Sequence, residues 1–217
     1  MRSTRFDAVL FDFSGVMVSS AFDALARLGD ASERERTLEL LLGPYHEDTD
    51  HPWHRVERGE LAIDAWVTEV AATATSEGVE IDWSVLGTLL GDLEPFPQME
   101  VEARRLRADG YRVGLVTNNV KEGSAAWRKL VPVDELFEVV VDSSEVGLRK
   151  PDARIYELTC ERIGVAPDAS VFIDDNAENI AAARALGMET VHFGENPFDA
   201  VAELDAILER RGVSPRT

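Results

Sequence analysis

The feature that most constrains the fold of this chain is a set of short, continuous apolar runs, rich in β-branched and aromatic residues. These runs do not alternate apolar with polar residues, which is typical of strands buried on both faces of a parallel sheet. The predicted strands cover residues 6–12, 112–118, 170–175 and 189–193, with 137–142 as a fifth.

Helical patterns separate several of these runs, and they cover residues 98–110, 151–164 and 176–187. Each pattern closes on a glycine, which suits the left-handed conformation that follows many helices. Strand and helix alternating at this spacing indicate βαβ units. The sequence therefore predicts an α/β fold built on a doubly wound parallel sheet.

The connection after the first predicted strand is longer than a βαβ crossover needs. It has helical patterns at 33–43, 62–78 and 83–92 but no convincing strand. Pro95 and Pro97 favour an extended linker where the chain returns to the sheet. We expect an inserted helical cap at 18–93 and a core domain formed by 1–17 and 94–217.

Composition narrows the class of partner. The 217 residues include 41 acidic and 22 basic side chains, and a net charge of −19 disfavours nucleic acid and anionic membrane surfaces. A single cysteine, Cys160, excludes an internal disulfide and a cysteine cluster for zinc. No run approaches the ~20 apolar residues of a membrane helix. We expect a soluble, cytoplasmic protein; its oligomeric state cannot be read from these features.

Polar residues stand at the ends of the predicted strands and before one helix: Asp12, Thr117 with Asn118, Lys150, and Asp174 with Asp175. In open α/β sheets, ligands bind outside the carboxyl ends of the strands. Taken singly, each residue has a plain structural explanation, as a turn, a helix cap or a solvated lysine. Their convergence on one edge from four segments indicates a functional site instead.

Four motifs carry these residues: "FDFSGV" at 11–16, "VTN" at 116–118, "GLRKPDARIY" at 147–156 and "FIDDNAENI" at 172–180. In this order they resemble the haloacid dehalogenase superfamily of aspartate-nucleophile phosphotransferases, and the helical insertion resembles that family's small cap. The last two motifs are most similar to a sugar-phosphate phosphatase branch that includes the phosphatase domains of epoxide hydrolases. The resemblance implies a Rossmann-like core and a hydrolase.

The resemblance also implies a nucleophile and a metal site. Asp12 would attack phosphorus to form an aspartyl-phosphate, a covalent intermediate that divides one difficult displacement into two easier ones. Mg²⁺ would be held by Asp12, Asp175 and the backbone carbonyl of Ser14. Asp174 would be either a further ligand or an anchor for a metal-bound water. The charges favour the same conclusion, because a carboxylate approaches a phosphate dianion only when a cation neutralises them.

The other motif residues would handle the phosphoryl group. Lys150 would neutralise Asp12 and the transferring oxygens, while Thr117 and the Asn118 amide would hold the group during an essentially electrostatic catalysis. The implied substrate is a small phosphorylated metabolite such as a sugar phosphate. Dehalogenases of the same superfamily lack paired acids in the fourth motif, so Asp174 and Asp175 argue against that activity.

Ser14 departs from the family pattern, which has an aspartate there as general acid and base. Serine has no useful pKa for this role, which is typically worth 10²–10⁴-fold in rate. Two possibilities would allow catalysis without an acid at position 14. Either the leaving group needs no proton, as in a sugar 1-phosphate or an acyl phosphate, or a cap side chain supplies the proton. The alternative function is a weak or inactive protein that binds a phosphorylated metabolite or a protein partner.

The cap offers candidates for that proton in "YHEDTDHPWHRVERGE" at 45–60: His46, His51, His54, Arg55 and Glu57. Histidine titrates near neutral pH and is the natural choice. Within this stretch, 53–59 is the piece expected to face the active site, with His54 and Arg55 as substrate-binding residues. The alternative is a hydrated acidic loop interrupted by Pro52.

Overall fold

The computed structural model describes residues 6–21, 34–44, 47–83 and 93–210. Its centre is a parallel five-stranded sheet with the order β3-β2-β1-β4-β5. The strands are β1 (Ala8–Phe11), β2 (Arg112–Thr117), β3 (Val139–Asp142), β4 (Ser170–Asp174) and β5 (Glu189–His192). All five predicted strands are confirmed, and the fold is the predicted α/β fold.

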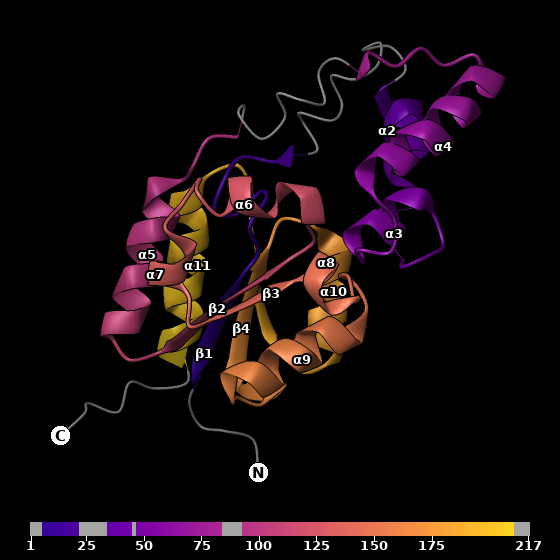
Figure 1. Ribbon diagram of the computed structural model, residues 1–217. Helices are drawn as coiled ribbons and strands as arrows, with labels where there is room; N and C mark the ends of the chain where they lie inside the picture. The colour runs from indigo at the N-terminus through magenta and orange to yellow at the C-terminus, as the bar shows by residue number, and fades with distance from the viewer. Residues whose placement is uncertain (1–5, 22–33, 45–46, 84–92, 211–217) are drawn as a thin grey trace.

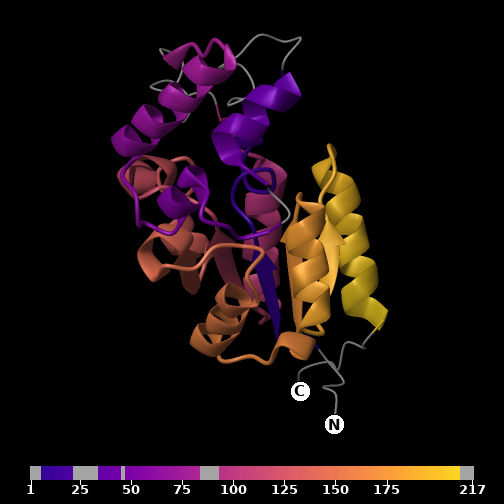
Figure 2. The ribbon, with the colours of Figure 1, turned by 90° about the vertical axis from the view of Figure 1, so that its right-hand side faces the viewer.

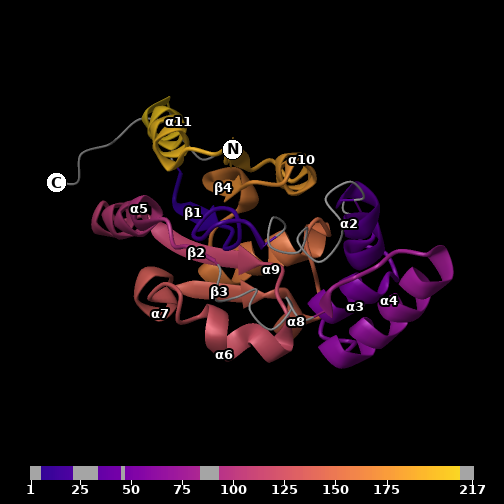
Figure 3. The ribbon, with the colours of Figure 1, turned by 90° about the horizontal axis from the view of Figure 1, so that it is seen from above.

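Helices cover both faces of this sheet (Figures 1 and 3). The four long ones are α5 (Pro97–Ala108) and α11 (Pro197–Arg210) on one face, and α9 (Ala153–Ile163) and α10 (Ala177–Ala185) on the other. Short elements join them: η4 (Lys121–Gly123), α6 (Ser124–Trp127), α7 (Val133–Leu136), α8 (Ser143–Val146) and η5 (Pro167–Ala169). The predicted helices α5, α9 and α10 are confirmed, whereas α11 is absent from the predicted set.

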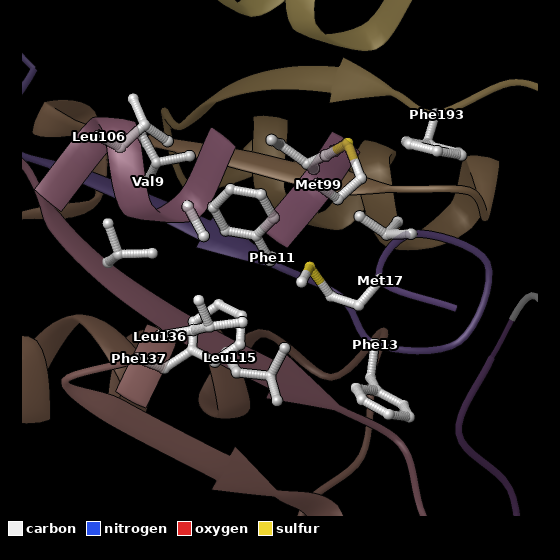
Figure 4. Packing of buried hydrophobic residues seen from close by; sticks show 14 of the residues in the cluster. Val9, Phe11, Phe13, Met17, Met99, Leu106, Leu115, Leu136, Phe137 and Phe193 are labelled. Atoms are coloured by element: carbon white, nitrogen blue, oxygen red, sulfur yellow. The ribbon is translucent and has the colours of Figure 1, made fainter. Parts of the chain in front are cut away.

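The two-sided cover explains why the strands read as continuous apolar runs. Val9 and Phe11 of β1 belong to the core beneath α5 and α11, where Figure 4 shows Phe11 close to Met99. Ala8 and Leu10, which point the opposite way, belong to the core beneath α9 and α10. Every residue of β1 is therefore buried.

The inserted segment forms a separate helical unit beyond the carboxyl ends of the strands (Figures 1 and 2). It contains α2 (Arg34–Leu42), α3 (Pro52–Glu57) and α4 (Ile63–Glu77), which pack around Leu41, Val56 and Trp66. Two of the predicted cap helices are thus present, and the pattern at 83–92 lies, apart from Trp83, outside the described residues. Residues 52–57, for which a loop interrupted by Pro52 is the alternative prediction, form helix α3, and Pro52 stands at its first position, where a proline is tolerated.

Two antiparallel segments connect this unit to the core. Ser19 N donates to Glu94 O at 2.8 Å, and Phe96 N donates to Met17 O at 2.9 Å. The proposed domain boundaries, at 17/18 and 93/94, lie within this pair of segments. Among the described helices, none combines the length and apolarity that a membrane crossing requires.

Candidate active site

The sequence motifs meet where β1 and β4 end side by side. Phe11 pairs with Ile173 in the parallel register, so Asp12 and Asp174 follow at the same edge of the sheet. This is also where the strand order reverses direction, the usual position of a ligand site in open α/β sheets. Carboxylate oxygens of Asp12, Asp174 and Asp175 lie within 4.8 Å of one another.

Lys150 lies between two of these acids. Its Nζ is 2.6 Å from Asp12 Oδ1 and 2.7 Å from Asp174 Oδ2, and the side chain is 1% exposed. The Asn118 side chain holds the lysine backbone: Lys150 N donates to Asn118 Oδ1 at 2.8 Å, and Asn118 Nδ2 donates to Lys150 O at 2.9 Å. The structure thus gives Asn118 a contact with the lysine loop, and its phosphoryl-binding role stays a prediction.

Asp174 is the most fully bonded of the three acids. Besides Lys150, it accepts hydrogen bonds from Asn176 N at 2.8 Å and from Asn179 Nδ2 at 3.1 Å to each oxygen. Of the two roles predicted for Asp174, these contacts suit an anchor better than a direct metal ligand. Asn179, within the fourth motif, is a contributor that sequence reasoning did not single out.

Asp175 lies against the backbone of Gly15. Gly15 has a φ of +88°, and a Cβ built on it would lie 2.0 Å from Asp175 Oδ2. A side chain at position 15 would therefore occupy the space that this carboxylate fills. The glycine that follows Ser14 in "FDFSGV" was an available signal for this close approach.

Burial and neighbouring negative charges raise the pKa values of two of the acids, Asp12 and Asp175. Burial raises the pKa of Asp12 well above its usual value; Lys150 opposes this shift, and Asp174 and Asp175 add to it. Burial and the charge of Asp174 raise the pKa of Asp175 to about 6. For Lys150, burial lowers the pKa, but Asp12 and Asp174 more than offset this and the net shift is upward, so the ammonium stays charged.

Three clustered acids with one lysine leave a surplus of negative charge in a buried place. A divalent cation would neutralise that surplus, and carboxylate oxygens are the ligands that hard cations prefer. The Gly15 backbone also leaves the room that Asp175 needs beside Asp12. The residues at this edge therefore fit a divalent metal.

Ser14 and Thr117 flank the acids. Ser14 Oγ accepts a hydrogen bond from Ala21 N at 2.9 Å, so the serine ties the first motif to the start of the inserted segment. Thr117 is fully buried at the end of β2, and its Oγ1 donates to Asn118 O at 3.3 Å. The catalytic roles of both residues, and the metal-binding role of the Ser14 carbonyl, stay predictions.

His54 and Arg55, the predicted substrate-binding residues of the cap, contact other residues of the cap. His54 is fully buried in α3, with its Nδ1 3.0 Å from Thr49 N, and burial lowers its pKa to about 3. A neutral imidazole at pH 7 cannot serve as the missing general acid. Arg55 lies 3.7 Å from Glu69, in ion-pair range. Their substrate-binding role stays a prediction, and His46 lies outside the described residues.

The segment 53–59 nevertheless contacts the core. Glu57 Oε2 accepts a hydrogen bond from Arg149 Nε at 2.7 Å. Arg149 directly precedes the site lysine, Lys150, in the chain. Arg149 is a second contributor that sequence reasoning passed over, although it stands in the third motif.

A comparison of the whole chain with family models identifies its family. The model described as haloacid dehalogenase-like hydrolase matches residues 6–187. The chain belongs to this hydrolase family. This hydrolase has many matches among curated proteins and among solved structures.

Two curated relatives illustrate the similarity of this hydrolase to known proteins. Acyl-CoA dehydrogenase family member 10 of Mus musculus is 30% identical over 93% of the chain, which spans only 19% of that protein. Sesquiterpene phosphatase astK of Aspergillus oryzae is 27% identical over 89% of the chain and 92% of its own length.

Solved structures agree with the fold. The HAD family enzyme bt-2542 of Bacteroides thetaiotaomicron, in a magnesium complex, superposes with a TM-score of 0.62 at 19% identity, covering 88% of this chain and 96% of its own. A structure described as a dehalogenase superposes with a TM-score of 0.66 at 20% identity, covering 94% and 97%. At these identities the likeness establishes the fold alone.

Proposed function

We propose that this hydrolase is a Mg²⁺-dependent phosphatase that acts on a small phosphorylated metabolite through an aspartyl-phosphate at Asp12. The observation that carries the proposal is the buried Lys150 ammonium, 2.6 Å from Asp12 and 2.7 Å from Asp174, beside the third carboxylate of Asp175. The phosphatase named among the curated relatives, which the chain matches over most of both lengths, adds support.

In the first step, a carboxylate oxygen of Asp12 attacks phosphorus, and the bond from phosphorus to the leaving oxygen breaks. In the second, water attacks phosphorus and the bond to Asp12 breaks, so that phosphate leaves as H₂PO₄⁻ with the oxygen and both protons of the water. The carboxylate is thereby regenerated. Lys150 orients Asp12 through Oδ1 and counters the negative charge of the transferring group.

The metal ligands would be Asp12, Asp175 and the Ser14 carbonyl, while Asp174 anchors Lys150 and the surrounding turn. Bound Mg²⁺ would supply the remaining charge neutralisation for a phosphate dianion. Asp174 suits the anchoring role because Asn176 and Asn179 fix both of its oxygens.

Ser14 restricts the leaving groups that this site handles. Its hydroxyl already accepts from Ala21 N, and it has no acidic proton to give at neutral pH. His54 does not replace it, since its pKa of about 3 leaves the ring neutral. We therefore expect fast turnover only of substrates whose leaving group departs without protonation, such as acyl phosphates and sugar 1-phosphates.

The test measures phosphate release from p-nitrophenyl phosphate, acetyl phosphate, a sugar 1-phosphate and an alkyl phosphate, with Mg²⁺ and with EDTA. Turnover of the first three with Mg²⁺, lost in Asp12→Asn, is the expected result. No turnover of any substrate favours the alternative, a protein that only binds a phosphorylated metabolite or a protein partner. Release of chloride from a 2-chloro acid without Mg²⁺ would favour a dehalogenase.

A further inference from the structure

A buried ion pair joins the cap to the loop that carries Lys150. Arg149 is 0% exposed and Glu57, 92 residues earlier in the chain, is 3% exposed. Besides its contact with Glu57, Arg149 Nη1 donates to Glu47 O at 3.2 Å and lies 3.8 Å from Asp48 Oδ1. One core side chain therefore holds both helix α3 and the loop that precedes it.

The residues that follow α3 contact both the preceding loop and the core. Arg58, directly after α3, donates to Asp48 Oδ1 and, at 2.9 Å, to Thr49 O, which ties the preceding loop to the helix. Gly59 lies on the core helix α8, where a Cβ would come within 2.3 Å of Ser144 O. The end of α3 thus rests directly on the core.

Arg149 and Lys150 are consecutive, and their side chains serve different partners. Lys150 points to Asp12 and Asp174, whereas Arg149 points to Glu57 in the cap. The Lys150 backbone is held by Asn118. The lysine loop is therefore fixed through Asn118 by the core and through Arg149 by the cap, and a shift of the loop would move the ammonium.

Stability alone does not explain why the buried Arg149–Glu57 pair is charged. Burying two ions costs desolvation energy, and apolar residues of similar volume often stabilise a fold as well or better. What a pair with fixed hydrogen-bond geometry adds is a defined position for the two segments that it joins. Here those segments are a cap helix and the loop of the site lysine.

We propose that Arg149 is a positioning residue: its pair with Glu57 holds α3 on the lysine loop and thereby keeps the Lys150 ammonium between Asp12 and Asp174. The kinetic part of this inference rests on the proposed phosphatase function, whereas the attachment itself does not.

The kinetic test compares Arg149→Met, Arg149→Lys and Glu57→Gln with Arg104→Met, which changes an exposed arginine of α5. A misplacement of about 1 Å can cost about 10²-fold. We expect Arg149→Met to lower kcat by about that factor for both p-nitrophenyl and acetyl phosphate, with KM little changed. We expect Arg149→Lys to keep part of the kcat that Arg149→Met loses, and Glu57→Gln to lower kcat less than Arg149→Met does. Arg104→Met should have the wild-type kcat.

A double variant that removes both charges separates a loss of positioning from a loss of folding stability. Arg149→Met combined with Glu57→Met leaves no unpaired buried ion and is expected to unfold near the wild-type urea midpoint while kcat stays low. Full recovery of kcat in this double variant would overturn the inference, because then only the stranded charge of the single variants would matter.

Hydrogen exchange gives a readout independent of activity. We expect the amide of Lys150, which donates to Asn118 Oδ1, and the amides of α3 to exchange faster in Arg149→Met, with α5 unchanged. The inference would be overturned if these amides exchanged in Arg149→Met at the wild-type rate. It would also be overturned if Arg149→Met changed only KM, by an amount that differs between substrates. If the wild-type protein releases no phosphate, the proposed function fails, and the exchange result alone decides whether Arg149 fixes the lysine loop.

Discussion

Replacing Gly15 by alanine separates the cost of backbone strain from the loss of the acidic site. Gly15 has a φ of +88°, and a left-handed conformation costs a residue with a side chain about 1–2 kcal/mol. The new Cβ would lie 2.0 Å from Asp175 Oδ2, whereas ordinary contact begins at 3.4 Å. The carboxylate must therefore move from 2.0 Å to 3.4 Å, a shift of 1.4 Å.

Gly78→Ala is the matched control. Gly78 ends helix α4 with a φ of +70°, and nothing lies within 4 Å of a Cβ built there. It carries the same kind of backbone strain without a collision and belongs to the cap. Because the Asp175 side chain can rotate away, we expect both variants to lose a similar 1–2 kcal/mol of unfolding free energy in urea.

Only Gly15→Ala should damage the site. If Asp175 is a ligand of Mg²⁺, as we propose, a shift above 1 Å in its carboxylate predicts about a 10²-fold loss of kcat/KM and a roughly 10–100-fold weaker affinity for Mg²⁺. Titration calorimetry with Mg²⁺ measures the affinity without reference to activity. If Gly15→Ala binds Mg²⁺ and turns over substrate as Gly78→Ala does, Asp175 is not a ligand and the reasoning is refuted.

Three further predictions concern the charges. Since the folded-state pKa of Asp175 is raised to about 6 from an ordinary 3.8, its stabilising contribution is present at low pH and is lost as the pH rises through 6. In EDTA, the free energy of unfolding should fall as the pH rises from 3.8 to about 6, and Asp175→Asn should reduce this fall. If the variant shows the same dependence of unfolding free energy on pH as the wild type, the raised pKa of Asp175 is contradicted. Lys150→Met strands two buried carboxylates and should cost about 3–5 kcal/mol in urea, whereas Lys129→Met, at an exposed lysine, should cost little. Ser14→Asp would supply the general acid that the family pattern has at this position and should raise turnover of an alkyl phosphate by about 10²–10⁴-fold. No gain would mean that another group supplies the proton.

The sheet could be predicted because burial on both faces leaves a local mark in the sequence. The central strands β1 and β4 are continuous, fully buried runs, and the polar residues that follow them meet at one edge because the strands share one direction. Helix α11 carried a comparable signal, since Ala200, Leu204 and Ile207 recur on one face, and it could have been found. Helix α3 was harder, because Pro52 suggests a break until its place at the first helical position is known.

The rest of the site depends on contacts that no local pattern encodes. The partner of Arg149 lies 92 residues away, and nothing near either residue identifies the other. Burial inside the cap lowers the pKa of His54 to about 3, so a residue type suited to proton transfer stands where its charged form is disfavoured. The motif order could locate the acids and the lysine, but only the packing gives Asp174 its saturated hydrogen bonds.

The most direct test of the central claim is to look for the phosphoryl group on Asp12. The protein is mixed with acetyl phosphate and Mg²⁺, quenched in acid within milliseconds, digested and analysed by mass spectrometry. The account predicts a phosphoryl group on the peptide that contains Asp12, absent with EDTA and absent in Asp12→Asn. Release of phosphate with no label at Asp12, and undiminished in Asp12→Asn, would contradict it.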